Sequence, residues 1–114
     1  MAYTAFNPLV VTIDNPSPAA VSATLVRPVK VVDAMAYVTT NAGAATSCQV
    51  SSAAGNITDS ISLGNNAAKK VGRAGEIDDA TNVINSGAVV TSTWAGAGTA
   101  GRVNIICVDN TANP

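Results

Sequence analysis

The fold of this chain is indicated first by a short stretch near its middle, Ala45-Thr46-Ser47-Cys48-Gln49-Val50-Ser51. In an extended conformation Thr46, Cys48 and Val50 share one side of the chain, and Ser47, Gln49 and Ser51 share the other. A period of two with one apolar side is typical of a β-strand that is buried on one side and wet on the other. The stretch therefore predicts a strand from a sheet that is covered on one face.

Similar stretches lie on both sides of this strand. Candidate strands separated by turn-forming residues cover residues 20–27, 29–39, 45–51, 88–94 and 102–108. They recur at intervals of roughly 8 to 12 residues, and shorter candidates lie at 57–63 and 69–74. The links are shorter than the dozen or so residues that parallel crossovers need. We predict an all-β fold, an antiparallel β-sandwich of jelly-roll or Greek-key type, with about seven or eight strands.

Composition supports a single folded β domain. The chain has 114 residues, a length at which one hydrophobic core is usual. It contains 15 Val and 7 Ile against 3 Leu, and branching at Cβ favours strands over helices. Charged residues make up 11% of the chain and the net charge is −1, whereas disordered chains usually combine low hydrophobicity with high net charge. So few charges cannot attract nucleic acid electrostatically.

One segment departs from the period of two. Between residues 76 and 86, Ile77, Ala80 and Ile84 fall at i, i+3 and i+7, which places them on one side of a helix. Acidic residues fill what would be the first turn, where carboxylates favour the positive end of the helix macrodipole, and Gly87 follows the last turn. The sequence thus predicts one short helix in an otherwise β fold.

The chain divides into three parts. Residues 1–18 contain three of the five prolines, which remove amide donors and favour extended geometry, so they are predicted to form an extended N-terminal arm. Residues 19–108 form the β-sandwich domain, and residues 109–114 form a short tail. The arm's candidate contact residues are Tyr3, Phe6, Pro8 and Leu9. The sequence leaves open whether the arm packs on its own domain or reaches a neighbouring molecule.

The residue types present exclude most catalytic mechanisms. The chain has no histidine, which is the commonest general base and transition-metal ligand. Its two cysteines, Cys48 and Cys107, are too few for a four-ligand zinc site, and a catalytic cysteine would lack a histidine partner. Both lie on the apolar sides of their strands, so we expect buried free thiols rather than a disulfide. We predict that the protein is not an enzyme and holds no cofactor or metal.

A complete G-x-G-x-x-G motif occupies residues 96–101. In dinucleotide-binding proteins a helix follows this motif, and the N-terminus of the helix binds the pyrophosphate. Here the motif is followed by the strand-like residues 102–108. We interpret the glycines as the bend of a hairpin loop.

Two charge clusters have a structural interpretation. The acidic cluster consists of Glu76, Asp78 and Asp79, which Asp59 could approach. It lacks the EF-hand spacing, and we interpret it as solvated carboxylates rather than a calcium site or a glycosidase pair. The basic cluster consists of Lys69, Lys70 and Arg73. No aromatic residue is interleaved with it, as nucleic-acid binding would require, and we interpret it as a solvated edge strand.

Trp94, the sole tryptophan, ends a candidate strand beside the glycine loop. It is expected either to fill the core or to contact a sugar or a protein partner, because one large amphipathic ring supplies much binding energy. The sequence favours the core without excluding the contact.

Four segments within residues 29–108 carry a resemblance to a known family. They are Val31-Val32-Asp33-Ala34-Met35-Ala36-Tyr37-Val38, Asn56-Ile57-Thr58-Asp59-Ser60-Ile61-Ser62-Leu63, Lys70-Val71-Gly72-Arg73-Ala74-Gly75-Glu76-Ile77-Asp78-Asp79-Ala80 and Ser86-Gly87-Ala88-Val89-Val90-Thr91. Together they resemble the head decoration, or cement, proteins of tailed bacteriophages. The resemblance implies a jelly-roll-like β domain that binds the outside of an assembled capsid and carries no catalytic residues.

On this resemblance we expect a structural virion protein that reinforces contacts between capsid subunits. Its partner would be the major capsid protein, with self-association as a trimer on the capsid as an extension. The expected location is the capsid exterior after synthesis in the host cytoplasm, since the N-terminus does not read as a signal peptide. No apolar stretch approaches the roughly 18 residues that cross a bilayer, so neither a membrane nor a nucleic acid is an expected partner.

The candidate interface combines the arm and the tryptophan. It consists of Tyr3, Phe6, Pro8, Leu9 and Trp94. The alternative function is a receptor- or glycan-recognition module of a phage fibre or surface adhesin, in which Trp94 and the glycine loop make the contact.

Overall fold

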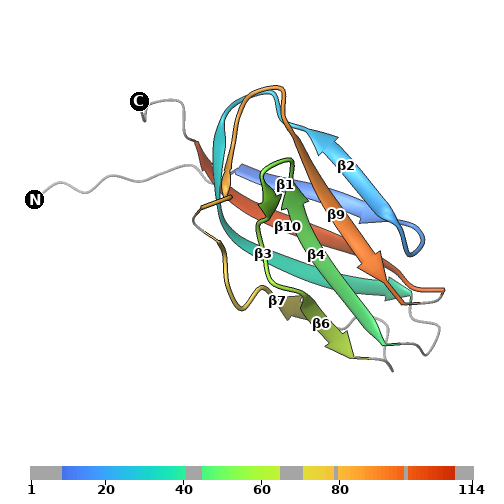
Figure 1. Ribbon diagram of the computed structural model, residues 1–114. Helices are drawn as coiled ribbons and strands as arrows, with labels where there is room; N and C mark the ends of the chain where they lie inside the picture. Colours follow the sequence, from blue (N-terminus) through green and yellow to red (C-terminus); the bar gives the residue numbers. More distant parts are fainter. Residues whose placement is uncertain (1–8, 41–44, 65–70, 79, 97, 110–114) are drawn as a thin grey trace, which may run out of the picture.

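The computed structural model describes residues 9–40, 45–64, 71–78, 80–96 and 98–109. In this part of the chain, strands form two antiparallel sheets that pack face to face (Figure 1). None of the described residues is helical, and accordingly no described helix is long and apolar enough to cross a membrane. The predicted antiparallel β-sandwich is confirmed.

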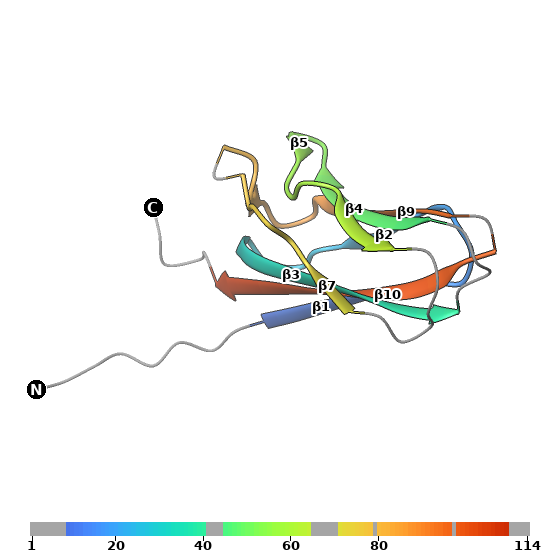
Figure 2. The same ribbon diagram turned by 90° about the horizontal axis from the view of Figure 1, so that it is seen from below.

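Each sheet has five strands, which alternate between the sheets along much of the chain. Sheet A has the order β1 (Leu9–Asn15), β10 (Ala100–Asp109), β3 (Val29–Thr40) and β7 (Val71–Arg73), with β8 (Val83–Ile84) beside the start of β3. Sheet B has the order β2 (Ala20–Thr24), β9 (Val89–Ala95), β4 (Thr46–Ser52) and β5 (Gly55–Asn56), with β6 (Ile61–Gly64) also on β4. Figure 2 shows the two sheets edge-on as two layers.

The core lies between the sheets and follows the alternation in the sequence. In β4, Thr46, Cys48 and Val50 are buried while the residues between them are only partly buried. In β10, Val103, Ile105 and Cys107 are buried in the same way. Both inner faces therefore consist of small and β-branched side chains, which fit the pleated surface of packed strands.

The predicted helix is wrong. Ile77 forms an isolated β-bridge with Thr58, and the Asp78 amide donates to the Ile57 carbonyl at 2.8 Å. Further along, Asn82 exchanges hydrogen bonds with Val31, and β8 pairs with the start of β3. The segment is thus tied at one end to Ile57 and Thr58 and at the other end to β3, which are distant in sequence. These pairings bury Ile84 without a helical turn, so tertiary contacts override the local spacing.

The glycine loop is not a hairpin, which corrects a second expectation. It joins β9 of sheet B to β10 of sheet A, and so carries the chain from one layer to the other. Gly96 and Gly98 have φ angles of 123° and 71°, in the region that favours glycine. A Cβ on Gly96 would also lie 2.8 Å from the Ala45 carbonyl oxygen. The glycines are therefore required by the turn itself.

Part of the expected N-terminal arm belongs to the sandwich. Residues 9–15 form β1, which pairs with β10 along its whole length, from Leu9 opposite Cys107 to Asn15 opposite Gly101. Leu9 and Val11 pack against the core from one side of β1. This portion of the arm is extended and packs on its own domain, whereas Tyr3, Phe6 and Pro8 lie outside the described residues.

Candidate docking surface

The outer face of sheet A carries large side chains in three cross-strand rows. The rows are Val10·Ile106·Asp33, Thr12·Asn104·Met35·Arg73 and Asp14·Arg102·Tyr37·Val71. Residues directly opposite one another in an antiparallel sheet point to the same side. We call these eleven residues the A face. Val71, Val10 and Met35 are 58%, 49% and 38% exposed, so the face presents apolar surface to solvent.

Two ion pairs neutralise the charges of the A face. Arg102 Nε donates to Asp14 Oδ1 at 2.6 Å. Arg73 contacts both carboxylate oxygens of Asp33, through Nε at 3.1 Å and a terminal nitrogen at 2.8 Å. In each pair the hydrogen bond, followed by charge attraction, raises the pKa of the arginine above its ordinary value. The charge of each arginine is therefore paired with a carboxylate on the same face.

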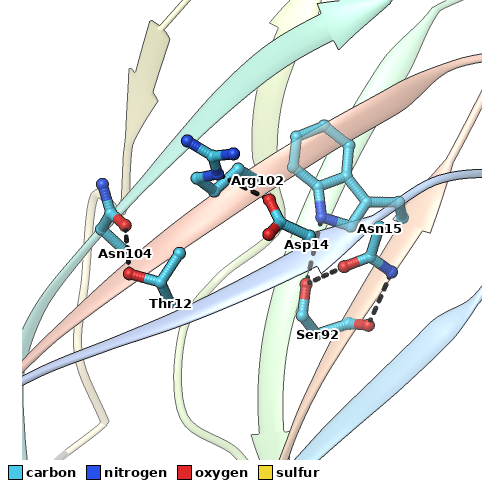
Figure 3. A network of polar contacts seen from close by, with 7 residues as sticks. Thr12, Asp14, Asn15, Ser92, Arg102 and Asn104 are labelled. Atoms are coloured by element: carbon cyan, nitrogen blue, oxygen red, sulfur yellow. Dashed lines mark hydrogen bonds and ion pairs between the residues drawn. The ribbon is translucent and has the colours of Figure 1, made fainter.

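The centre of the A face is an open depression. It is lined by Met35, Tyr37, Val71, Arg102 and Asn104, which come from β3, β7 and β10. Asn104 is oriented by a hydrogen bond of 2.9 Å from Thr12 (Figure 3). Tyr, Met and Arg are enriched in protein–protein interfaces, and Tyr and Arg are also enriched among binding hot spots. The depression therefore has the side-chain chemistry of a protein-binding surface.

The outer face of sheet B is different. Its outward residues, which we call the B face, are Ala20, Ser22, Thr24, Ser47, Gln49, Ser51, Ser62, Val89, Thr91, Thr93 and Ala95. They are uncharged and, apart from Gln49 and the exposed Val89, small. Ser22 and Thr91 hydrogen-bond to each other across the strands at 2.9 Å. Ser and Ala are depleted at interfaces, and Ser and Thr are rare among hot spots. The A face is therefore closer in composition to known protein-binding surfaces than the B face is.

Trp94 lies in the core. Its side chain is 2% exposed, and Nε1 donates to Ser92 Oγ at 3.0 Å. The ring packs directly over Gly101 of the opposite sheet, where any Cβ would overlap the ring. The last glycine of the G-x-G-x-x-G motif thus makes room for the tryptophan. Because the ring is enclosed, the structure supports the core interpretation and does not support a partner or glycan contact through Trp94.

A buried polar network joins the two sheets beside this ring. Asn15 of β1 donates through Nδ2 to the carbonyls of Ala19 and Ser92, at 3.0 and 3.3 Å. Its Oδ1 accepts from Ser92 Oγ at 3.1 Å (Figure 3). A buried network is stabilising when its polar atoms find partners, and this one fixes how β1 sits over β9. Its position between the sheets indicates a structural role.

Both cysteines are free and buried, as expected. Burial raises the pKa of each thiol to about 11. For Cys48 a hydrogen bond with Ser92 partly opposes that rise. A thiol held neutral at physiological pH is a poor nucleophile.

The two charge clusters are described only in part. Glu76, Asp78 and Asp59 line an open depression with Gln49 and Thr58, but no group of three metal-ligating side chains converges in the part of the chain that the structure describes. Asp59 instead accepts a hydrogen bond from the Gly75 amide. Arg73 lies in β7 at the edge of sheet A. Asp79, Lys69 and Lys70 lie outside the described residues.

The sequence interpretation did not identify the A face. The candidate interface included Leu9, which is half-buried and packs on the core, but none of the outward residues of β3, β7 and β10. The sequence did contain a signal, because large side chains lie on both sides of the strands Val29–Thr40 and Ala100–Asp109 and not only on the side that faces the core. Which outward residues adjoin depends on strand order, which the sequence does not state.

Comparison with known proteins adds no relative. The sequence matches no protein-family model and no curated protein.

Proposed function

We propose that this protein is a structural docking module that binds the outer surface of a phage capsid through the A face and reinforces contacts between capsid subunits. The observation that carries the proposal is the contrast between the outer faces. One presents Met35, Tyr37 and two neutralised arginines, and the other presents mainly Ser, Thr and Ala. The capsid as partner rests on the resemblance of four segments to phage head decoration proteins.

The strand order supports the finer assignment of a jelly roll. The order β1-β10-β3-β7 faces the order β2-β9-β4-β6, with β5 as a short extra strand on β4. β8 is likewise a short extra strand beside β3. The two sets of four strands, connected in this way, are expected of a jelly roll, an architecture that occurs in viral capsid proteins. This is the architecture that the resemblance implies.

The A face is small, and its size fits binding to a repetitive surface. Four strands about 4.8 Å apart and seven residues with a rise of about 3.3 Å cover roughly 400 Å². Stable interfaces usually bury about 800 Å² on each partner. A shell presents many equivalent sites, so copies held next to one another gain affinity through multivalency.

The test inserts one charge at the centre of each outer face. Met35→Lys places an ammonium in the depression of the A face, and Thr93→Lys is the matched control on the B face. Purified variants are sedimented with capsids of the phage that encodes the chain, and the bound fraction is measured. We expect Met35→Lys to lower the apparent affinity at least tenfold and Thr93→Lys to leave it unchanged. Equal binding by both folded variants would exclude the A face.

The arm requires its own measurement. Tyr3, Phe6 and Pro8 remain proposed contact residues, and deletion of residues 1–8 leaves β1 intact. If the arm docks on the capsid, the deletion lowers occupancy while the unfolding midpoint stays the same. Unchanged occupancy would remove the arm from the interface and leave the A face as the docking element.

A further inference from the structure

One side of the sandwich has an open edge. β1 has seven residues, and in the described part of the chain it pairs with β10 alone. Its register with β10 runs without a bulge from Leu9 to Asn15. The other edge strands are shorter: β7 has three residues, and β2 on sheet B has five. A long, regular, mostly uncharged edge strand offers unpaired amides and carbonyls to another strand.

The two sheets are in close contact along one side of the sandwich, and a groove lies between them along the other side. Beside β7, Gly72 lies close to Leu63 and Ile61 of β6, and a Cβ added at Gly72 would lie 2.6 Å from Leu63 Cδ2 and 3.0 Å from Ile61 Cγ2. The two sheets are therefore in close contact on this side. Beside β1, a mainly apolar groove opens between the sheets, and Thr24 and Arg27 also line it. Its apolar lining consists of Leu9, Val10, Val11, Ala23, Leu25 and Val26. Val26 is 87% exposed. Figure 1 shows β1 and β2 along this side and β6 and β7 along the opposite side.

We propose that two copies of this chain pair edge to edge through β1. The two β1 strands run antiparallel about a two-fold axis at Thr12, which joins sheet A of both copies into one continuous sheet. Symmetric association of this kind requires a surface that complements itself. The residue pattern of β1 meets that requirement.

Alternation restricts the register. Opposed residues in an antiparallel pair point to the same side, so inward residues must oppose inward residues. A two-fold axis at Thr12 satisfies this condition and is the centre that pairs all seven residues. It sets Val11 against Ile13, both inward, and Thr12 against its own copy. Opposed threonines are a favourable cross-strand pair.

The charges are compatible with this register. Asp14 is the one charged residue of β1, and the axis sets it against Val10 rather than against the second Asp14. Its carboxylate is already paired with Arg102 of its own chain. No like charges therefore face each other across the junction.

The pairing doubles the docking area that the A face presents. A two-fold axis perpendicular to the sheet keeps both A faces on the same side, so the pair presents about twice the area of one copy. This consequence rests on the proposed function, although the pairing itself does not. A strand pair alone buries little area, so we expect the free pair to be weak and concentration-dependent.

Cysteine cross-linking of the full chain tests the register. Directly opposed Cα atoms lie about 4.5 to 5.5 Å apart, within the range that a disulfide spans. Under mild oxidation without capsids, Thr12→Cys is expected to form a disulfide-linked dimer, and Val10→Cys and Asp14→Cys to cross-link only when mixed. Ser62→Cys on β6 is the exposed control and is expected to remain monomeric. Cys48 and Cys107 stay in place because both are buried.

Two outcomes overturn the pairing. One is that Thr12→Cys cross-links no faster than Ser62→Cys. The other is that Val10→Cys alone links as well as the mixture, since that indicates random collision or another symmetry such as a three-fold trimer. Thr12→Lys, which opposes two ammonium groups, should shift sedimentation toward the monomer. The capsid-binding result for Met35→Lys is independent, so either proposal can fail while the other stands.

Discussion

The two outer faces of this sandwich share a backbone pattern and differ in chemistry. In both sheets, every second residue of a strand points outward and forms the outer face. The residues between them point inward and fill the core that the two sheets share. The A face carries Met35, Tyr37, Arg73 and Arg102, whereas the B face carries mainly Ser, Thr and Ala. Outward residues contribute little to packing, so folding does not dictate their size. The contrast is the observation on which we propose that the large side chains of the A face serve an interaction.

The largest expected effect is on the core that both faces share. Trp94→Ala removes a ring that is 2% exposed and packs over Gly101. We expect the free energy of unfolding to fall by about 3 to 5 kcal/mol, measured by urea denaturation. Variant protein that remains folded should bind as the native protein does. If the Trp94→Ala variant lost capsid binding while its stability stayed the same, Trp94 would have a recognition role. The contrast between the two outer faces would then explain less of the binding.

Two serines of sheet B allow its inner and outer sides to be compared. Ser92 points into the core, and Ser62 lies on the outer side. Ser92→Ala leaves Trp94 Nε1 and Asn15 Oδ1 without this hydroxyl partner, and is expected to cost about 1 to 3 kcal/mol. Ser62→Ala on the B face should change stability by less than about 0.5 kcal/mol. If both variants lost a comparable amount of unfolding free energy, the B face would contribute to stability in a way that its composition does not suggest.

The cysteines predict a loss of stability at alkaline pH. Burial raises the folded-state pKa of Cys48 and Cys107 to about 11, above the ordinary 9.0. Between these values the unfolded chain releases the protons and the folded chain keeps them, so stability present below about pH 9 is lost as pH rises towards 11. A pKa difference of about two units corresponds to at most roughly 2 to 3 kcal/mol for each thiol once the pH exceeds about 11, and to less within the window. A Cys48→Ala, Cys107→Ala double variant should show a shallower decline in urea midpoint, and an equal decline would exclude this cause.

The smallest expected effect concerns the ion pairs of the A face. Asp14→Asn and Asp33→Asn each free an exposed arginine. Exposed pairs add little stability, so the unfolding midpoint should not change measurably. Capsid binding should become more sensitive to salt, because an unpaired charge is screened. Unaltered salt dependence would indicate that these charges lie outside the contact.

Most strands follow from side-chain alternation. The buried residues of β4 and β10 are those that the period of two places on the apolar side. Pro28 lies between β2 and β3, where the chain crosses from sheet B to sheet A, as its missing amide donor suggests. These features are local, because a side chain's preference for water or core acts at each position.

The errors arose where distant partners decide the structure. Residues 76–86 have helical spacing, yet Ile77 bridges to Thr58 and β8 pairs with β3. The glycine loop has hairpin residues, yet it links the two sheets. The A face was missed for the same reason, because Arg102, Tyr37 and Val71 adjoin only through the pairing of three strands. Local spacing contains no information about which strands become neighbours.

By itself, the sequence determined that this protein is a near-neutral β domain rich in Val and Ile, because alternation and branching at Cβ act on each residue separately. Only the tertiary structure decided which outward residues form one surface and which strand edge stays open. Both depend on strand order, which is set by the simultaneous packing of the whole chain.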